Sequence, residues 1–387
     1  TDNDILTLCS EFTITGDSSK ISSTVISGQE SGSILEFYQG GSIIIDGITI
    51  EGGYNEYQSQ DGLWVESTEK FTFSNSILKN CQVYNGNGGV GGSLSSLDSV
   101  FIYNSKIISN HDNYNTDGVI SIENVDYVSI RKVKFTDNSA VVGSAIRSDG
   151  INYLEIDSSR FNNNISQAEY YPGVIWTGQS TITIKNSFFH RNSGFLTVRG
   201  YGDSEGFLID IEQTSIIDND NVISYGSYSN PPQNGQQVPV FEITNTVFWE
   251  NQDFAVWPFQ NWGDIFVGSV NISNSLIWPF DHIDYMSGSN NIFIDPLFCD
   301  EDNSDYSIAA NSPLVSGGVD GTQIGCFGVG CNAVYNGPNW YVSNSGSNDD
   351  GDGSEQNPFN TIQFGLERMQ NGDTLIIYEG DYYENAV

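Results

Sequence analysis

Hydrophobic positions recur along most of the chain in one fixed frame. In the segment FIYNSKIISN, Ile102 is followed five residues later by Ile107, and three residues after that by Asn110. The frame returns about every 28 residues. Its further copies begin at Ile45, Ile130, Ile156, Ile184, Ile211, Ile243 and Ile272, and one shifted copy reads Thr72, Ile77 and Asn80. A period of this length predicts a repeat architecture.

Each period contains short runs in which apolar and polar residues alternate, such as YLEID, TITIK and FEITN, and this is the pattern of β-strands. Glycine, asparagine, aspartate and serine interrupt the runs every few residues, and no apolar period has the length of a helix. The regularly spaced leucines of a leucine-rich repeat are missing. Three strands and three turns fit one period, so we expect an all-β parallel β-helix of about ten coils of ~28 residues.

The asparagine of the frame predicts a structural role. Successive coils pair about 4.8 Å apart, which stacks the Ile and Phe residues of the frame inside the helix. Asparagines at the same turn of successive coils tolerate left-handed backbone angles and can hydrogen-bond along the stack. We therefore expect an asparagine ladder that takes no part in catalysis.

These residues also carry a family resemblance. FTDN, FNNN, FHRN and FWEN, together with the turns GGVGGSL, VVGSAI and YPGVIW, resemble the GGA…FxxN repeats of polymorphic outer-membrane proteins and their extracellular relatives. GSAI is an imperfect match to the first half of that repeat. The resemblance places the chain with right-handed parallel β-helix proteins of the pectate-lyase-like superfamily. It implies an extracellular or cell-surface location.

The last hundred residues extend the resemblance. Segments 294–318 and 324–331 resemble the closing part of these β-helices, and the resemblance implies a disulfide between Cys299 and Cys331. A connector follows at 332–339. Residues 340–387 are similar to the opening of the same fold, with a short capping helix near 361–369 that covers the apolar end of a stack.

This order indicates a circularly permuted repeat unit. Residues 1–331 hold the coils and the closing segment, and residues 340–387 form the cap and first coil of the next repeat. Joining Val387 to Thr1 gives one uninterrupted opening. Identical units then stack head to tail, either as covalent tandem repeats or by strand addition between chains. We favour tandem repeats, because both termini fall within regular structure.

The charge and the cysteines of the chain limit the classes of partner and the cellular compartment that we expect. The chain has 49 acidic and 13 basic residues, and a net charge of -36 repels nucleic acids and anionic membrane surfaces. No run of eighteen apolar residues exists to cross a membrane. The five cysteines show no metal-ligand spacing, which favours disulfides in an oxidising compartment. The pairing of Cys9, Cys81 and Cys326 stays open.

Residues that could carry catalysis are scattered. NTDG at 115–118 resembles one element of the polygalacturonase signature, but the paired aspartates, the Gly-His-Gly and the Arg-x-Lys of that family are missing from the following coils. A calcium-assisted lyase would use a groove of basic and acidic residues. Its candidates are Arg131, Lys132, Lys134, Arg160, Arg191, Asp137 and Asp157. Alternatively, they are solvated outer-face residues that balance local acid, or contacts to a neighbouring fibril.

Three further sets of residues are candidate sites. Asn348, Asp350 and Asp352 resemble half of an EF-hand loop and are candidate calcium ligands, although Phe359 occupies the twelfth position. Asn164 and Asn271 begin N-I-S sequences, which are glycosylation acceptors in a eukaryote. Four tryptophans suit glycan stacking or an interface, or the packing of a long loop. These are Trp249, Trp257, Trp262 and Trp278.

Taken together, the sequence predicts a structural repeat unit of a secreted, filament-forming β-helix protein that contacts identical units head to tail. We expect no catalysis and no cofactor apart from calcium. The alternative is a polysaccharide lyase or hydrolase, or a glycan-binding surface adhesin.

Overall fold

The computed structural model describes residues 12–16, 24–28, 34–55, 62–83, 89–112, 118–167, 173–178, 180–200, 207–227, 240–252, 256–258, 270–278 and 286–384. The chain divides into two compact units. The first comprises Thr1–Ile294 and Ser316–Cys326, and the second comprises Asp295–Val315 and Phe327–Val387. The predicted domain limits at residues 331 and 339 stay a prediction.

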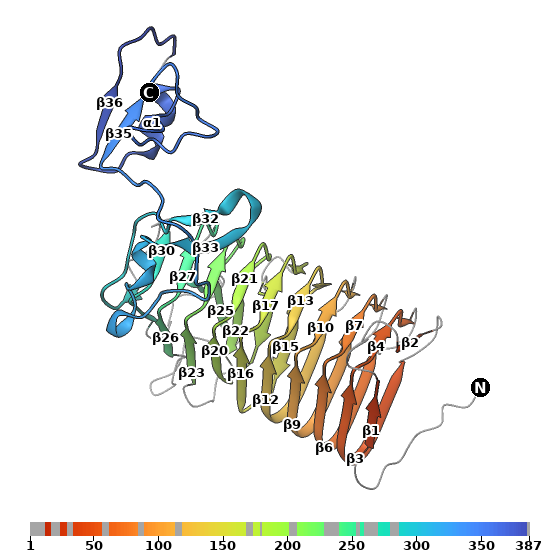
Figure 1. Cartoon of the computed structure of the whole chain (residues 1–387). Coiled ribbons are helices and arrows are strands. Elements are labelled where there is room, and N and C mark those ends of the chain that lie inside the picture. The colour runs from red at the N-terminus through yellow and green to blue at the C-terminus, as the bar shows by residue number, and fades with distance from the viewer. Residues whose placement is uncertain are drawn as a thin grey trace. The chain divides into compact units, whose positions relative to one another are not determined.

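The first unit is a parallel β-solenoid, which confirms the predicted fold class. Its strands stack side by side along one axis (Figure 1) and form parallel sheets of 16, 10 and 5 strands, here called sheets A, B and C. The solenoid makes about seven regular turns that repeat ~28 residues apart, fewer than the ten expected. Sheet B continues into the less regular coils at both ends.

Sheet A contains sixteen strands, among them the four longest, β3, β6, β9 and β12. The sixteen are β1 (Phe12–Thr15), β3 (Leu35–Asp46), β6 (Leu63–Ser74), β9 (Gly92–Tyr103), β12 (Ile120–Arg131), β15 (Ile146–Asp149), β16 (Tyr153–Asp157), β19 (Ile175–Thr177), β20 (Thr181–Lys185), β22 (Leu196–Gly200), β23 (Leu208–Glu212), β25 (Ile223–Ser227), β26 (Val240–Thr244), β28 (Val256–Pro258), β29 (Val270–Ser273) and β31 (Met286–Ser287). The long strand β12 pairs with both β15 and β16, because later coils break this strand in two.

Sheets B and C are built from shorter strands. Sheet B contains β2 (Val25–Ser27), β4 (Thr49–Glu51), β7 (Ile77–Lys79), β10 (Lys106–Ile108), β13 (Lys134–Thr136), β17 (Arg160–Asn162), β21 (Phe188–His190), β24 (Ser215–Ile217), β27 (Val247–Trp249) and β30 (Leu276–Trp278). Sheet C contains β5 (Tyr54–Asn55), β8 (Gln82–Val83), β11 (His111–Asp112), β14 (Ser139–Ala140) and β18 (Ile165–Ser166).

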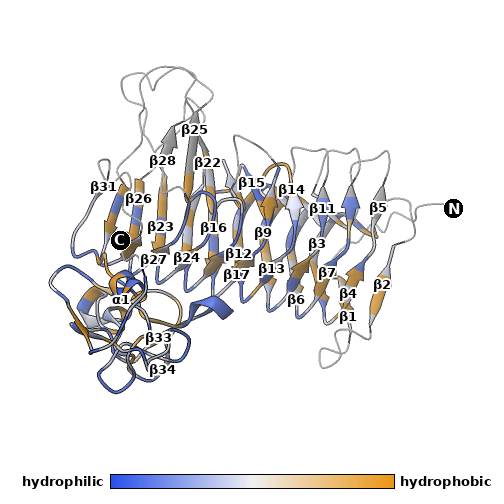
Figure 2. Ribbon diagram, turned by 90° about the horizontal axis from the view of Figure 1, so that it is seen from above, coloured by the Kyte–Doolittle hydropathy of each residue, from blue (hydrophilic) through white to orange (hydrophobic). Residues whose placement is uncertain are grey.

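The core consists of the apolar residues of the repeated frame. Ile102 pairs in register with Ile130, and Ile107 with Phe135, so equivalent side chains of successive coils stack inside the solenoid. These residues are buried, whereas hydrophilic residues alternate with them along each strand (Figure 2). Phe135 and Phe161 stack with ring centroids 4.7 Å apart. The predicted inward stack is confirmed.

The shifted copy of the frame was wrongly aligned. Phe73, not Thr72, pairs with Ile102, and Leu78, not Ile77, pairs with Ile107. Cys81 therefore occupies the position that asparagine holds in later coils. The alignment of the repeats put Asn80 at this position because it matched asparagine to asparagine. The apolar residues of this coil are in fact displaced by one residue from that alignment.

The second unit contains small sheets and the one α-helix of the described residues. β32 (Phe298–Asp300) pairs antiparallel with β33 (Asp305–Ala309), which pairs with β34 (Val329–Cys331). β35 (Asn339–Val342) and β36 (Thr374–Ile377) pair in parallel. Helix α1 (Ile362–Arg368) begins after Thr361, whose side chain accepts a hydrogen bond from the Phe364 backbone N–H, and it confirms the predicted helix near 361–369. Short 3-10 turns are η3 (Glu301–Asn303) and η4 (Pro313–Val315) here, and η5 (Val319–Gly321) in the first unit.

Candidate functional site

The asparagine ladder runs through six coils at the turn after sheet B. It consists of Asn110, Asn138, Asn164, Asn192, Asn219 and Asn251, all buried. The Asn164 carboxamide oxygen accepts from the backbone N–H of Asn138 at 3.3 Å and from its side-chain amide at 2.9 Å. The Asn164 amide donates in turn to Asn192 Oδ1 and to the Phe135 carbonyl. The ladder thus satisfies buried backbone groups that the turn would leave without partners.

One expectation for these asparagines was wrong. The left-handed backbone conformation belongs to the residue before each ladder asparagine, such as Asp137 (φ 55°), Asn163 (φ 55°) and Arg191 (φ 52°). The ladder asparagines themselves are not among the described residues of positive φ. Asparagine is therefore selected at this turn for its hydrogen-bonding groups and not for its tolerance of left-handed angles.

A second ladder, which the sequence reading missed, lies at the turn between sheets A and B. It is formed by Ser76, Ser105, Ser159, Ser187, Thr214, Thr246 and Ser275. The Ser187 hydroxyl accepts from the Ser159 backbone N–H at 3.2 Å and donates to the Lys185 carbonyl at 2.7 Å. An Asn-Ser or Asn-Thr pair recurs at this point of five coils, so the sequence contained the signal.

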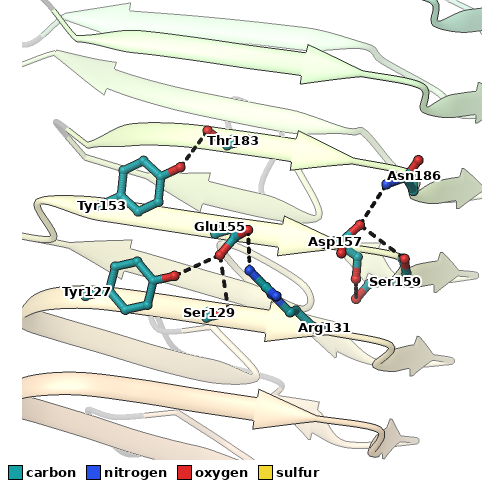
Figure 3. A network of polar contacts seen from close by, with 10 residues as sticks. Tyr127, Ser129, Arg131, Tyr153, Glu155, Asp157, Ser159, Thr183 and Asn186 are labelled. Carbon is teal, nitrogen blue, oxygen red and sulfur yellow. Dashed lines mark hydrogen bonds and ion pairs between the residues drawn. The ribbon is translucent and has the colours of Figure 1, made fainter.

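Polar side chains on the outer face of sheet A form a network across neighbouring coils (Figure 3). Glu155 of β16 accepts from the Tyr127 hydroxyl at 2.8 Å and forms an ion pair with Arg131 at 2.6 Å, both from β12. The hydrogen bond from the Arg131 guanidinium, opposed by partial burial, holds the pKa of Glu155 below its ordinary value. Burial, with Glu155 beside it, raises the pKa of Tyr127. Glu155 therefore lacks the raised pKa of a general acid.

Aromatic rings continue this face along the axis. Tyr127 and Tyr153 stack with centroids 5.6 Å apart and planes 7° apart, and the Tyr153 hydroxyl lies 3.0 Å from the Thr183 hydroxyl. Phe101 lies 5.8 Å from Tyr127, and the Lys70 ammonium lies 4.7 Å from the Phe101 centroid. Rings stacked on one another in this way use their faces for packing, so this row stabilises the sheet and offers sugars mainly ring edges.

The residues of the predicted lyase groove do not converge on one site. Arg131 and Asp157 lie on the outer face of sheet A, whereas Lys134 and Arg160 lie on the outer face of sheet B. Lys132, Asp137 and Arg191 occupy turn positions of positive φ. Of NTDG, residues 115–117 lie outside the described residues.

Only two of the four predicted tryptophans have side chains that the structure describes. Trp249 and Trp278 stack on neighbouring strands of sheet B, with centroids 6.0 Å apart and planes 22° apart. Trp249 is buried, whereas Trp278 is 41% exposed. The side chain of Trp257 and all of Trp262 lie outside the described residues.

The acidic loop uses its predicted ligand residues internally. The Asn348 carboxamide oxygen accepts from the backbone N–H groups of Asn360 and Thr361, and Asp352 accepts from the Ser354 N–H. Asp350 lies on the exposed side of the same turn. Across the part of the chain that the structure describes, no three His, Cys, Asp or Glu side chains are grouped to hold a metal ion. The calcium site stays a prediction, and the Asn348 oxygen that would bind the ion already accepts two backbone hydrogen bonds.

The cysteines and glycosylation acceptors take distinct places. Cys299 and Cys331 form a disulfide within the second unit. Cys81 is buried and Cys326 is half-buried, neither of them in a disulfide among the described residues, and Cys9 lies outside those residues. The Asn164 amide is buried and hydrogen-bonded within the ladder, which argues against its glycosylation in the folded chain. Asn271 is partly exposed and donates to Glu242 at 2.8 Å, and its modification stays a prediction.

A strap of residues 318–326 crosses the outer face of the solenoid. The Gln213 side-chain amide donates to the carbonyls of Gln323 and Gly325 at 2.8 and 2.6 Å. Asn245 accepts from the Val319 backbone N–H, and Ser215 accepts from the Cys326 N–H. The strap thus adds an irregular segment of the chain over sheet B.

Comparisons with known proteins add no information on the function of this chain. No family model matches the chain, and neither a curated protein nor a solved structure resembles it significantly. In the described part of the chain, no helix is both long and apolar enough to cross a membrane.

Proposed function

We propose that this chain is a structural module of an extracellular, filament-forming β-helix protein, and that its copies join end to end through open strand edges. The observation that carries the proposal is that two strands of matching length and polarity, β1 and β36, each pair on one edge only among the described strands. An open edge with an apolar face is a template for a further parallel strand.

The first edge closes the early end of the solenoid. β1 pairs with β3, and its side chains alternate between half-buried and exposed. Phe12 and Ile14 point to the core side and continue the columns of Ile43 and Ile45. Val25 on the neighbouring strand β2 is 43% exposed. Apolar columns therefore extend to the end of the described stack.

The second edge lies in the other unit. Trp340 and Val342 of β35 are buried, and they pair in register with Leu375 and Ile377 of β36. Leu375 is half-buried, whereas Ile377 is 45% exposed and Tyr378 is 37% exposed. Helix α1 packs on this face, since Gly365 approaches the Leu375 and Val342 side chains. The apolar face is thus complete on β35 and open on β36.

The two edges fit one another by polarity. Placing Leu375 beside Phe12 and Ile377 beside Ile14 keeps both apolar pairs on the inner face and makes the same parallel pairing as between β1 and β3. A cap-like β35–α1–β36 element would then cover the early end of a neighbouring solenoid. The pectate-lyase-like resemblance supports this arrangement, because it assigns residues 340–387 to the opening of such a fold.

The extracellular location rests on the Cys299–Cys331 disulfide, since disulfides persist in oxidising compartments. The structural role is supported by the ladders, which use the repeated polar residues to satisfy the backbone. Glycan binding is a second candidate, supported by the exposed Trp278 stacked on Trp249. Oligosaccharide titration followed by tryptophan fluorescence, with Trp278→Ala as the control, tests it.

Sedimentation velocity of the purified chain tests end-to-end joining. We expect association that grows with protein concentration and rods longer than one unit in negative-stain micrographs. Ile377→Asp places a charge on the open apolar face, and it should raise the dissociation constant at least tenfold. Thr374→Asp is the matched control, because it adds the same charge to the opposite face of the same strand and should leave association largely intact. A wild-type chain that stays monomeric at all concentrations would overturn the proposal.

A further inference from the structure

Sheet B carries a column of exposed positive charge. Lys106 of β10 pairs in register with Lys134 of β13, which pairs with Arg160 of β17. All three side chains are exposed on the outer face, and Lys132 lies exposed at the turn before β13. We call Lys106, Lys134 and Arg160 the cationic strip. Neighbouring coils pair about 4.8 Å apart, so these like charges repel one another across adjacent strands.

The strip differs from most other cations of this acidic chain. Lys79, Arg131, Arg147, Lys185 and Arg191 each form an ion pair with a carboxylate. Lys106, Lys132 and Lys134, by contrast, have no carboxylate within ion-pairing distance among the residues that the structure describes. A stacked pair of lysines without counterions, in a chain of net charge -36, indicates a surface for an anionic partner.

The same column shows what can lie on this face. After Arg160 it continues as Phe188, Ser215 and Val247, which are buried. The strap accounts for part of this cover, since Gly325 approaches Val247 and the Cys326 N–H bonds to Ser215. The strap, a segment of this same chain, thus already lies over the later coils, and the column changes from apolar and small to cationic where the strap ends.

An acidic segment of the same chain complements the strip. Asp349, Asp350, Asp352 and Glu355 lie within seven residues of one exposed loop of the second unit, and none of them has an ion pair among the described residues. The loop is held in shape from inside by Asn348 and Ser347. It therefore presents several carboxylates on a preformed turn, which reduces the entropy lost on binding.

We propose that the cationic strip binds the acidic loop Asp349–Glu355 of a second copy of this chain. The contact is lateral, because it uses the outer face of sheet B and leaves the open edges of β1 and β36 free. It goes beyond end-to-end joining and would give copies of the chain a second way to associate. The partners attract through several close charge pairs, whereas the long-range repulsion of two acidic molecules is screened beyond about 8 Å at physiological ionic strength.

A charge exchange tests the contact in an Ile377→Asp background, in which end-to-end joining is blocked. Lys106→Glu with Lys134→Glu reverses the strip, and Asp349→Lys with Asp350→Lys reverses the loop while sparing Asp352, whose carboxylate accepts from the Ser354 N–H. Arg160 is kept, because it lies near the end of the strap. Sedimentation equilibrium of each protein and of a mixture gives the dissociation constants.

We expect the background protein to associate, each reversed variant to lose association at least tenfold, and an equimolar mixture of the two to regain it. High salt should weaken every complex. Far-ultraviolet circular dichroism and melting temperature show whether each variant is folded, and Lys106→Gln with Lys134→Gln gives a milder version with an intermediate loss. Reversed variants that associate as well as the background, a mixture that does not regain association, or a background protein that stays monomeric would each overturn the lateral contact. None of these results bears on end-to-end joining, which is measured with Ile377 intact.

Discussion

At the scale of single residues, Asn164 joins three coils through one carboxamide. Its oxygen accepts two hydrogen bonds from Asn138, and its amide donates to Asn192 and to the Phe135 carbonyl. We predict that Asn164→Ala lowers the free energy of unfolding by about 2–4 kcal/mol, since each buried group left without a partner costs about 1–3 kcal/mol. Urea denaturation followed by circular dichroism measures the change.

Asn162→Ala is the matched control for that prediction. Asn162 lies two residues away on β17, and its side-chain oxygen has no hydrogen-bond partner among the residues that the structure describes. Removing it should change the free energy of unfolding by less than about 0.5 kcal/mol. Equal losses at the two positions would show that the ladder contributes no special stability.

The Arg131–Glu155 ion pair predicts a pH dependence. The pKa of Glu155 is lowered in the folded chain, so its contribution to stability is present above the ordinary pKa of 4.5 and is lost as the pH falls through the folded value. Arg131→Gln should therefore lower the urea midpoint near neutral pH, and this difference should disappear in acid. Lys134→Gln, which removes a cation that has no described carboxylate partner, should show no such acid-limited difference.

Sequence alone predicted the residues that face inward better than those that meet on the surface. Ile102, Ile107 and Phe135 follow from the apolar frame, because burial constrains residue type in every coil. The contact of Tyr127 with Glu155 could not be predicted, since it depends on the register between two coils whose turns differ in length. The repeated Asn-Ser pairs carry a signal for the second ladder, but serine is so frequent at turns throughout the chain that this periodicity does not stand out.

At the scale of elements, the strap is held on the solenoid by a few hydrogen bonds, and it contains the half-buried thiol of Cys326. Burial raises the pKa of the Cys326 thiol, and the Gln213 amide donates to the carbonyls of Gln323 and Gly325, just before Cys326 in the chain. We predict that Gln213→Ala accelerates alkylation of Cys326 at least fivefold, because the strap detaches more often and the thiol is then exposed and more easily ionised. Mass spectrometry after brief iodoacetamide treatment, with Cys9→Ser to remove a third thiol, gives the rate.

Cys81 supplies an internal control in the same experiment. Its thiol is buried in the ladder position of an early coil, far along the stack from the strap, and its alkylation rate should stay unchanged. Equal acceleration at both cysteines would indicate general loosening of the solenoid. The fold-back of the strap onto Gln213 and Asn245 was not predictable from the closing motif, because its contacts span about a hundred residues and involve common polar side chains.

At the scale of the whole molecule, a solenoid is stabilised by contacts between neighbouring coils, so its ends open more readily than its middle. β17 pairs on both sides, with β13 and β21, whereas β1 and β36 each pair with one described strand. Alternate residues of a parallel strand donate to the same neighbour, and the Gly16 N–H bonds to the Asp46 carbonyl, so the Thr15 N–H faces the open edge of β1. The Ile377 N–H faces the open edge of β36 in the same way, since the Tyr378 N–H bonds to the Val342 carbonyl. Amide exchange should therefore be slow at Phe161 and fast at Thr15 and Ile377 in dilute protein. End-to-end joining adds a neighbour to both open edges, and it should slow exchange at Thr15 and Ile377 as the protein concentration rises, while exchange at Phe161 stays constant. Hydrogen-exchange mass spectrometry at two concentrations, repeated with Ile377→Asp, separates this effect from lateral association through sheet B, which would leave exchange at both edges independent of concentration.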